Sequence, residues 1–92
     1  MQVQYTQNLD VAWRAVEGEA VLVHPLDGKM LILNQVGTFI WECLEVPQSL
    51  DDLTFRLQEA FEVDEETAQK DTKSFIELLL EKDCLQITEI IK

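Results

Sequence analysis

The segment from Leu33 to Leu44 constrains the fold of this chain more than any other. Here an apolar, strand-like run ends at Asn34 and passes directly into an amphipathic helical pattern. Two further strand-like runs precede this junction, and two helical patterns follow it. The sequence therefore predicts strands first and helices afterwards within one small unit.

The length of the chain limits it to one modest core. It has 92 residues, of which 47% are hydrophobic and 27% are charged, as in ordinary globular domains. No segment reaches the roughly 18 apolar residues of a membrane span, and the N-terminus lacks a basic-then-apolar signal peptide. We therefore expect a cytoplasmic protein with no membrane partner.

The net charge argues against one large class of partners. It is -11, from 18 acidic and seven basic residues. A negative field of this size repels phosphate backbones. Nucleic acid is therefore not an expected partner.

Three short runs of apolar and β-branched residues predict strands joined by tight turns. The runs span 12–16, 19–24 and 29–33, with turns at Glu17-Gly18 and at 25–28. Such spacing predicts an antiparallel meander.

The third predicted strand is apolar on both faces. Met30 and Ile32 lie on one side, and Leu31 and Leu33 on the other. A half-exposed strand would alternate with polar residues, so both sides are expected to be covered. The cover can come from helices of the same chain or, in part, from a binding partner.

Three helices are expected after the strands. The first runs from Val36 to Glu45, and the second opens at Ser49, which forms a capping-box-like pair with Asp52. Asp64 is the predicted N-cap of the longest helix, 65–82. The fold class is α+β and winged helix-turn-helix-like: a three-stranded antiparallel β meander followed by three α-helices.

Two stripes are visible along the longest helix. The inward stripe is Ala68, Thr72, Phe75, Ile76 and Leu79, and the solvated one is Glu66, Lys70, Lys73, Glu77 and Glu81. Lys70 and Lys73 form a local positive spot that could orient an acidic peptide; a plain solvated face is the alternative.

The ends of the chain have weaker patterns. Residues 1–10 are polar and patternless, and we expect an arm there, followed by a domain over 11–88 and a tail over 89–92. Within the domain, residues 85–88 form either a short final strand or a tail that packs on the sheet.

No catalytic, metal-binding or cofactor-binding constellation is visible. His24 has no neighbouring nucleophile, and Cys43 and Cys84 are 41 positions apart without further ligands, as expected for buried reduced thiols. The acidic clusters Asp51-Asp52 and Asp64-Glu65-Glu66 fall in first helical turns, where carboxylates meet the helix dipole favourably. We expect no catalysis, metal or cofactor. The alternative, an enzyme with its active site at His24 or Asp51, would require that the isolated chain turn over a substrate.

The order and spacing of the apolar positions resemble the PqqD-like family, coenzyme PQQ synthesis protein D, whose domain is the RiPP precursor peptide recognition element. The resemblance covers residues 11–85. The residues that carry it are Leu33, Asn34, Gly37, Ile40, Trp41, Leu44, Ser49, Leu50, Leu53, Leu57, Phe61, Val63, Asp71, Phe75 and Leu79. The family usually has Gly near the end of the long helix, where this chain has Asp83-Cys84; Asp tolerates the left-handed conformation of such a cap.

This resemblance implies a non-enzymatic adaptor for a ribosomally made precursor peptide. The leader of the precursor would add as a strand to the third strand of the sheet, facing the third helix. A peptide-modifying enzyme, commonly a radical SAM protein, would receive the cargo in PQQ or other RiPP biosynthesis. Carried onto this sequence, the peptide-binding residues are Lys29, Met30, Leu31, Ile32, Leu33, Lys70, Lys73, Ser74, Glu77 and Leu78. Proline at Leu31 is expected to weaken binding if the N–H of Leu31 points to the peptide.

Two other functions remain open from the sequence. One is a winged-helix DNA-binding regulator, although the middle helix carries only Arg56 among several acids. The other is a protein-interaction module of unrelated purpose.

Overall fold

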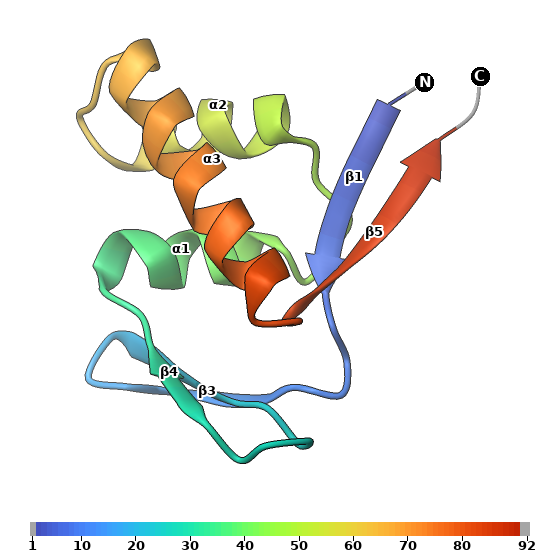
Figure 1. The fold of residues 1–92 in the computed structure, drawn as a ribbon. Coiled ribbons are helices and arrows are strands. Elements are labelled where there is room, and N and C mark those ends of the chain that lie inside the picture. Colours follow the sequence, from blue (N-terminus) through green and yellow to red (C-terminus); the bar gives the residue numbers. More distant parts are fainter. Residues whose placement is uncertain (1, 91–92) are drawn as a thin grey trace.

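Residues 2–90 form two antiparallel sheets and three helices (Figure 1). The computed structural model describes residues 2–90, without the side chains of residues 2, 89 and 90. Residue 1 of the predicted arm and residues 91–92 of the predicted tail lie outside this range. The elements are β1 (Gln2–Gln7), β2 (Ala12–Val16), β3 (Glu19–Val23), β4 (Met30–Ile32), α1 (Gln35–Cys43), α2 (Leu50–Ala60), α3 (Glu65–Glu81) and β5 (Leu85–Ile90). The predicted fold class, an α+β fold with a three-stranded meander and three helices, is confirmed.

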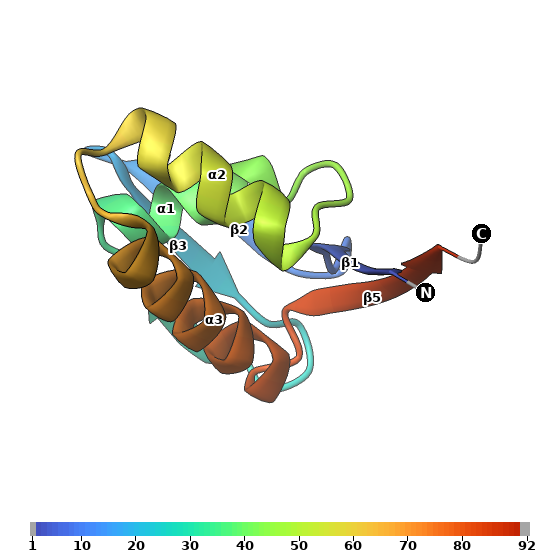
Figure 2. The ribbon, with the colours of Figure 1, turned by 90° about the horizontal axis from the view of Figure 1, so that it is seen from above.

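Strands β1 and β5 form a second sheet that the sequence does not predict. They pair antiparallel over their whole length and extend to one side of the helices (Figure 2). Tyr5 and Gln48 also exchange backbone hydrogen bonds of 2.7 and 2.9 Å, which fix β1 to the loop between α1 and α2. Residues 1–10, expected to be patternless, thus contain a strand. The 85–88 segment is a strand, but it pairs with β1 and not with the three-stranded sheet.

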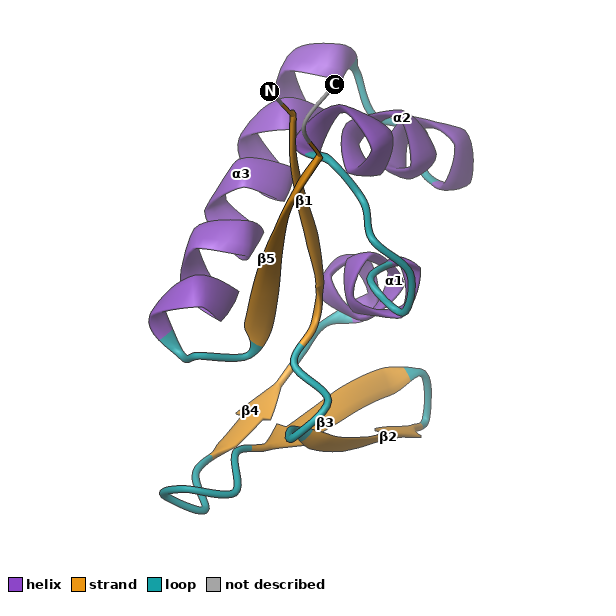
Figure 3. Cartoon of the chain, turned by 90° about the vertical axis from the view of Figure 1, so that its right-hand side faces the viewer, coloured by secondary structure: helices purple, strands orange, loops and turns teal. Residues whose placement is uncertain are grey.

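The three-stranded sheet has the order β2-β3-β4, with β4 at one edge. The β2–β3 turn places Glu17 at φ 52° and Gly18 at φ 83°, the two positive values that suit a two-residue hairpin. In Figure 3 the helices lie on one side of this sheet, and the β4 edge is on the side of α3. One face of the sheet is therefore covered by helices.

Side-chain caps fix where the second and third helices begin. Ser49 and Asp52 form a complete capping box, with both hydrogen bonds at 3.0 Å. The carboxylate of Asp64 accepts the backbone N–H of Thr67 at 2.7 Å, and hydrogen bonds from Thr67 hold the pKa of Asp64 below its usual value. The predicted caps at Ser49 and Asp64 are confirmed.

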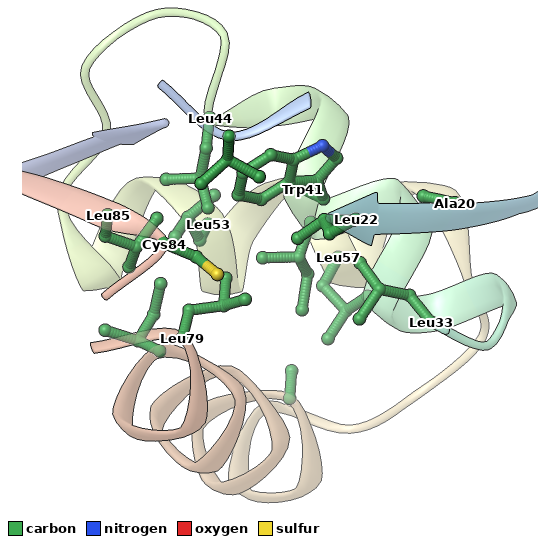
Figure 4. Close-up of a cluster of buried hydrophobic side chains, with 14 residues drawn as sticks. Ala20, Leu22, Leu33, Trp41, Leu44, Leu53, Leu57, Leu79, Cys84 and Leu85 are labelled. Carbon is green, nitrogen blue, oxygen red and sulfur yellow. The ribbon is translucent and has the colours of Figure 1, made fainter. Parts of the chain in front are cut away.

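The core lies between the three-stranded sheet and the helices, and Trp41 is one of its side chains (Figure 4). The indole of Trp41 is fully buried and meets Trp13 of β2 edge to face, with ring centroids 6.0 Å apart. Such aromatic pairs stabilise a fold by about 0.5–1.5 kcal/mol beyond area burial. The helix α3 contributes the predicted inward stripe, in which Ala68, Thr72, Ile76 and Leu79 are buried and Phe75 is half-buried.

Two buried side chains of the described residues have a polar atom without a hydrogen-bond partner, namely Nε1 of Trp41 and Oγ1 of Thr72. Thr72 of α3 is fully buried, and its hydroxyl has no hydrogen-bond partner in residues 2–90. A desolvated hydroxyl without a partner costs about 1–3 kcal/mol of stability. The hydroxyl of Thr38 on α1 contrasts with it, because Thr38 Oγ1 accepts the N–H of Ala20 at 2.8 Å.

Thr72→Val should therefore raise the free energy of unfolding by about 1 kcal/mol. The matched control, Thr38→Val, should lower it, because the N–H of Ala20 loses its acceptor. Urea denaturation followed by circular dichroism measures both changes. A less stable Thr72→Val variant would show that the Thr72 hydroxyl forms a stabilising hydrogen bond.

Candidate functional site

The edge strand β4 has an open backbone ladder. The N–H of Leu33 donates to the carbonyl of Ala20 at 2.9 Å, and in an antiparallel pair the direction of the backbone groups alternates. Leu31 therefore faces β3 with its N–H and C=O, as Leu33 does. The same groups of Met30 and Ile32 face away from β3, toward the free edge of the sheet.

The side chains of β4 also alternate between two environments. Leu31 is half-buried and Leu33 is buried on the inner face, against the helices. Met30 and Ile32 remain 64% and 62% exposed on the outer face. Helices of the same chain therefore cover the inner face of β4, and its outer face is exposed.

A hollow of about 450 Å³ lies between β4, the loop before it and the C-terminal end of α3. We call it the β4 hollow. Its lining is mixed, with apolar side chains from the sheet and charged ones from the loop and helix end. The lining residues are Leu22, His24, Leu26, Asp27, Lys29, Met30, Leu31, Glu81, Lys82, Asp83 and Cys84.

A second hollow of about 370 Å³, which we call the α1 hollow, lies between the start of α1 and the middle of α3. Apolar side chains make up most of it, and Asn34, Asp71 and Ser74 supply polar groups. The remaining lining residues are Val36, Gly37, Ile40, Phe75 and Leu78. The α1 hollow adjoins the middle of α3 and the β4 hollow adjoins its C-terminal end, so α3 borders both.

The predicted peptide-binding residues divide into three groups. Lys29, Met30 and Leu31 line the β4 hollow, and Ser74 and Leu78 line the α1 hollow. Ile32 is exposed at the strand edge and Leu33 is buried beneath it. The exposed residues Lys70, Lys73 and Glu77 line neither hollow.

Part of the α3 face that lines the α1 hollow is not predicted from the sequence. Asp71, Ser74, Phe75 and Leu78 share one face of the helix at i, i+3, i+4 and i+7 spacing. Phe75 is assigned to the inward stripe from its periodicity, yet its half-buried ring also lines the α1 hollow. The spacing alone could identify this face only once the position of α1 is known.

The β4 hollow is bordered by a contact between two distant segments. Asp83 follows α3 at φ 57°, the left-handed conformation expected for this cap. Its Oδ2 lies 3.3 Å from Nε2 of His24, whose Nδ1 accepts the N–H of Leu26 at 3.2 Å. Glycine at residue 83 could adopt the same conformation but could not contact His24 in this way.

Neither thiol is set up as a nucleophile. Burial raises the pKa of the Cys84 thiol, and the nearby carboxylates of Asp83 and Asp27 raise it further. Burial also raises the pKa of Cys43, although Arg56 opposes that effect. A thiol with a raised pKa stays protonated at neutral pH and reacts slowly.

Neither a metal-binding cluster nor a membrane-spanning helix is present in the described part of the chain. Between residues 2 and 90, no three His, Cys, Asp or Glu side chains are grouped so that they could hold a metal ion. No helix in this part of the chain has the length and apolarity that crossing a membrane requires.

Comparison with known families identifies the chain. The sequence model of coenzyme PQQ synthesis protein D, PqqD, matches residues 19–85, which run from β3 to the first residue of β5. The chain belongs to the PqqD family. The predicted resemblance is thereby confirmed, and the β4–α3 site of this PqqD-family protein lies wholly within the matched residues.

Two solved structures share the fold. One is TbiB1 in complex with the TbiA(beta) leader peptide, which is 26% identical, with a TM-score of 0.80 over 88% of this chain and 94% of that chain. The other is lasso peptide synthetase B1 complexed with the leader peptide, at 20% identity and a TM-score of 0.78 over 89% and 96% of the two chains. No curated protein sequence matches this chain.

The α1 hollow depends on a close approach at Gly37, near the start of α1. A methyl group added there would lie 2.9 Å from Cε1 of Phe75 and 3.3 Å from Oδ1 of Asn34. That oxygen is the cap of α1, because it accepts the N–H of Gly37 at 2.8 Å. The position therefore has no free space for a side chain.

Gly37→Ala should lower the free energy of unfolding by about 1 kcal/mol. Overpacking costs about 1–3 kcal/mol and outweighs the gain in helix propensity of up to about 1 kcal/mol. The matched control adds Phe75→Leu, which removes the ring edge, so Gly37→Ala should cost less in that background. Urea denaturation of the four proteins gives the coupling, and the absence of coupling would contradict the contact.

Proposed function

We propose that this PqqD-family protein is a RiPP recognition element, a non-enzymatic adaptor that binds the leader of a ribosomally made precursor peptide and presents it to a modifying enzyme. The observation that carries the proposal is the open ladder of Met30 and Ile32 next to two hollows along α3. Family membership and the likeness to two leader-bound proteins support it.

The geometry suits an extended peptide added as a fourth strand. The peptide would pair with the backbone groups of Met30 and Ile32 that face away from β3. Its residue opposite Leu31 would point to the inner face, because directly opposed residues in a sheet share a face. Alternate leader residues would then enter the hollows beside α3. There an apolar leader side chain would pack against Phe75 and Leu78.

Other parts of the proposal follow from the chemistry of an adaptor. The protein supplies backbone hydrogen bonds and apolar pockets, so it needs no catalytic group, metal or cofactor of its own. A modifying enzyme, commonly a radical SAM protein in this family, provides the chemistry. We place the complex in the cytoplasm, where precursor peptides are translated, and we expect sub-micromolar affinity, equivalent to at least about 8 kcal/mol.

Titration with the leader of the precursor encoded beside its gene should shift a defined set of backbone amides. In ¹H–¹⁵N spectra the largest changes should fall on residues 29–33 and on the α3 face that includes Ser74 and Leu78. The reason is that an added strand changes the hydrogen bonding of β4 and the packing beside α3. Changes confined to β1 and β5 would reject this binding mode.

The ladder direction corrects the expectation about proline at Leu31. The N–H of Leu31 points to β3, so proline there would break the sheet and not the peptide contact alone. Ile32→Pro instead removes an N–H at the free edge. It should weaken leader binding by at least about tenfold, because a peptide carbonyl loses its donor.

Ile32→Ala is the matched control for this substitution. It shortens the same side chain but keeps the N–H, and it should bind the leader nearly as well as the natural protein. Isothermal titration calorimetry measures both affinities, and thermal melting checks that both variants are folded. Equal binding by folded Ile32→Pro would exclude strand addition at this edge.

A further inference from the structure

The β4 hollow combines an apolar floor with a charged rim. Its floor includes the buried side chains of Leu22 and Cys84 and the half-buried side chain of Leu31. Its rim consists of exposed charged residues from the loop before β4 and from the end of α3, namely Asp27, Lys29, Glu81, Lys82 and Asp83. A lysine or arginine side chain has the same division, because an apolar stem carries its charged head.

The carboxylate of Asp83 is fixed at this rim. Its backbone has the left-handed conformation, with φ at 57°, which costs energy for a residue other than glycine. Its Oδ2 lies 3.3 Å from Nε2 of His24, and its side chain remains 72% exposed. Because His24 follows β3 and Asp83 follows α3, the contact holds the carboxylate between the sheet and the helix.

The negative charge of Asp83 is not neutralised by its neighbours. The Nδ1 atom of His24 accepts the N–H of Leu26 at 3.2 Å, so the ring hydrogen is on Nε2 and is donated to Asp83. A ring with a single N–H is neutral. Among the side chains that the structure describes, neither Lys29 nor Lys82 forms an ion pair with a carboxylate.

The thiol of Cys84 in the floor indicates the sign of the local field. Burial is the largest cause that raises the pKa of this thiol, and the carboxylates of Asp83 and Asp27 raise the pKa further. Lys82 lowers the pKa, but by less than either carboxylate raises it. Negative charge therefore outweighs positive charge at the floor, although two lysines belong to the rim.

A leader strand added to β4 would direct one side chain into this environment. The leader residue opposite Leu31 points to the inner face of the sheet, where the β4 hollow lies. The α1 hollow borders a different part of α3 and would receive a different leader residue. A basic side chain in the β4 hollow would cover Leu31 and Cys84 with its stem and place its charge beside Asp83.

We propose that Asp83 is a specificity-determining residue, which selects a leader that has lysine or arginine at the position entering the β4 hollow. This inference rests on the proposed function, because the leader must first pair with β4. An acidic side chain at that position would be repelled. Lys70 and Lys73, from which the sequence suggests an acidic peptide, line neither hollow.

The test compares Asp83→Asn and Asp83→Gly with the natural protein. Asparagine and glycine both tolerate the left-handed conformation, so both variants should fold. Asparagine also keeps an oxygen that can accept the Nε2–H of His24, so Asp83→Asn removes only the charge. Glu59→Gln is the matched control, because it removes the same charge from an exposed position of α2 that lines neither the β4 hollow nor the α1 hollow.

The probes are the fluorescently labelled leader encoded beside this chain's gene and a panel of its variants. In each variant one lysine or arginine is replaced by methionine, which keeps an apolar stem without the charge. Fluorescence anisotropy measures the affinity of every pair, and thermal melting checks that the protein variants are folded.

One leader variant should bind the natural protein about three- to tenfold more weakly than the leader itself, because an ion pair is lost. The same replacement should have no effect on binding to Asp83→Asn or Asp83→Gly, whereas Glu59→Gln should behave as the natural protein does. The difference should shrink in about 1 M NaCl, where the reach of charge falls to about 3 Å.

Three results would overturn the inference. If the leader binds but no replacement of a lysine or arginine weakens binding, the hollow does not select a basic residue, and the proposed function still stands. Equal losses for the natural protein and for folded Asp83→Asn would mean that the basic residue binds elsewhere. If the natural protein does not bind the leader, the proposed function fails and the inference fails with it.

Discussion

Helix α1 joins the parts of this protein, and the rest of the structure depends on its burial. On one side Trp41 packs edge to face against Trp13 of β2, and the hydroxyl of Thr38 accepts the N–H of Ala20 in β3. On the other side the side-chain amide of Gln7 donates to the carbonyl of Trp41 at 2.8 Å, which attaches β1 to the end of the helix. One nine-residue helix thereby positions both sheets.

The position of α1 also shapes the candidate site. Because Gly37 lets α1 approach Phe75 of α3 closely, the two helices form the α1 hollow directly beyond the end of β4. Strand β4, Asn34 and helix α1 follow one another in the sequence. One short segment therefore supplies both the open backbone groups of β4 and part of the apolar lining of the α1 hollow. This explains why the Leu33–Leu44 segment is so informative about the fold: it contains the junction from which the site is built.

Local signals predict much of the fold. The caps at Ser49 and Asp64, the Glu17-Gly18 turn and the buried stripe of α3 follow from short-range chemistry that each segment carries in itself. The β1–β5 sheet was missed because its pairing joins the two ends of the chain. Its alternation in β1, where Val3 and Tyr5 are separated by Gln4, is a weak signal among polar neighbours.

The lining of the two hollows is less predictable from the sequence than the fold is, for a similar reason. Periodicity indicates that α3 has an apolar side but not which neighbour lies at each angle around it, so it does not predict that Asp71 and Phe75 line the α1 hollow. The direction of the Leu31 N–H likewise depends on the pairing register with β3, which a single strand does not encode. These features arise from packing between elements, beyond what each element specifies.

The shortness of β4 affects the tendency of the protein to aggregate when no peptide is bound. The strand has three residues, and only two of them offer backbone groups to the outside. Long unpaired edges recruit other chains into aggregates, whereas very short ones do so poorly. The backbone hydrogen bonds of two residues give little affinity for an arbitrary strand. The choice of ligand is therefore determined by side chains that fit the neighbouring hollows. A brief edge thus protects against indiscriminate β-aggregation while still admitting a matching sequence.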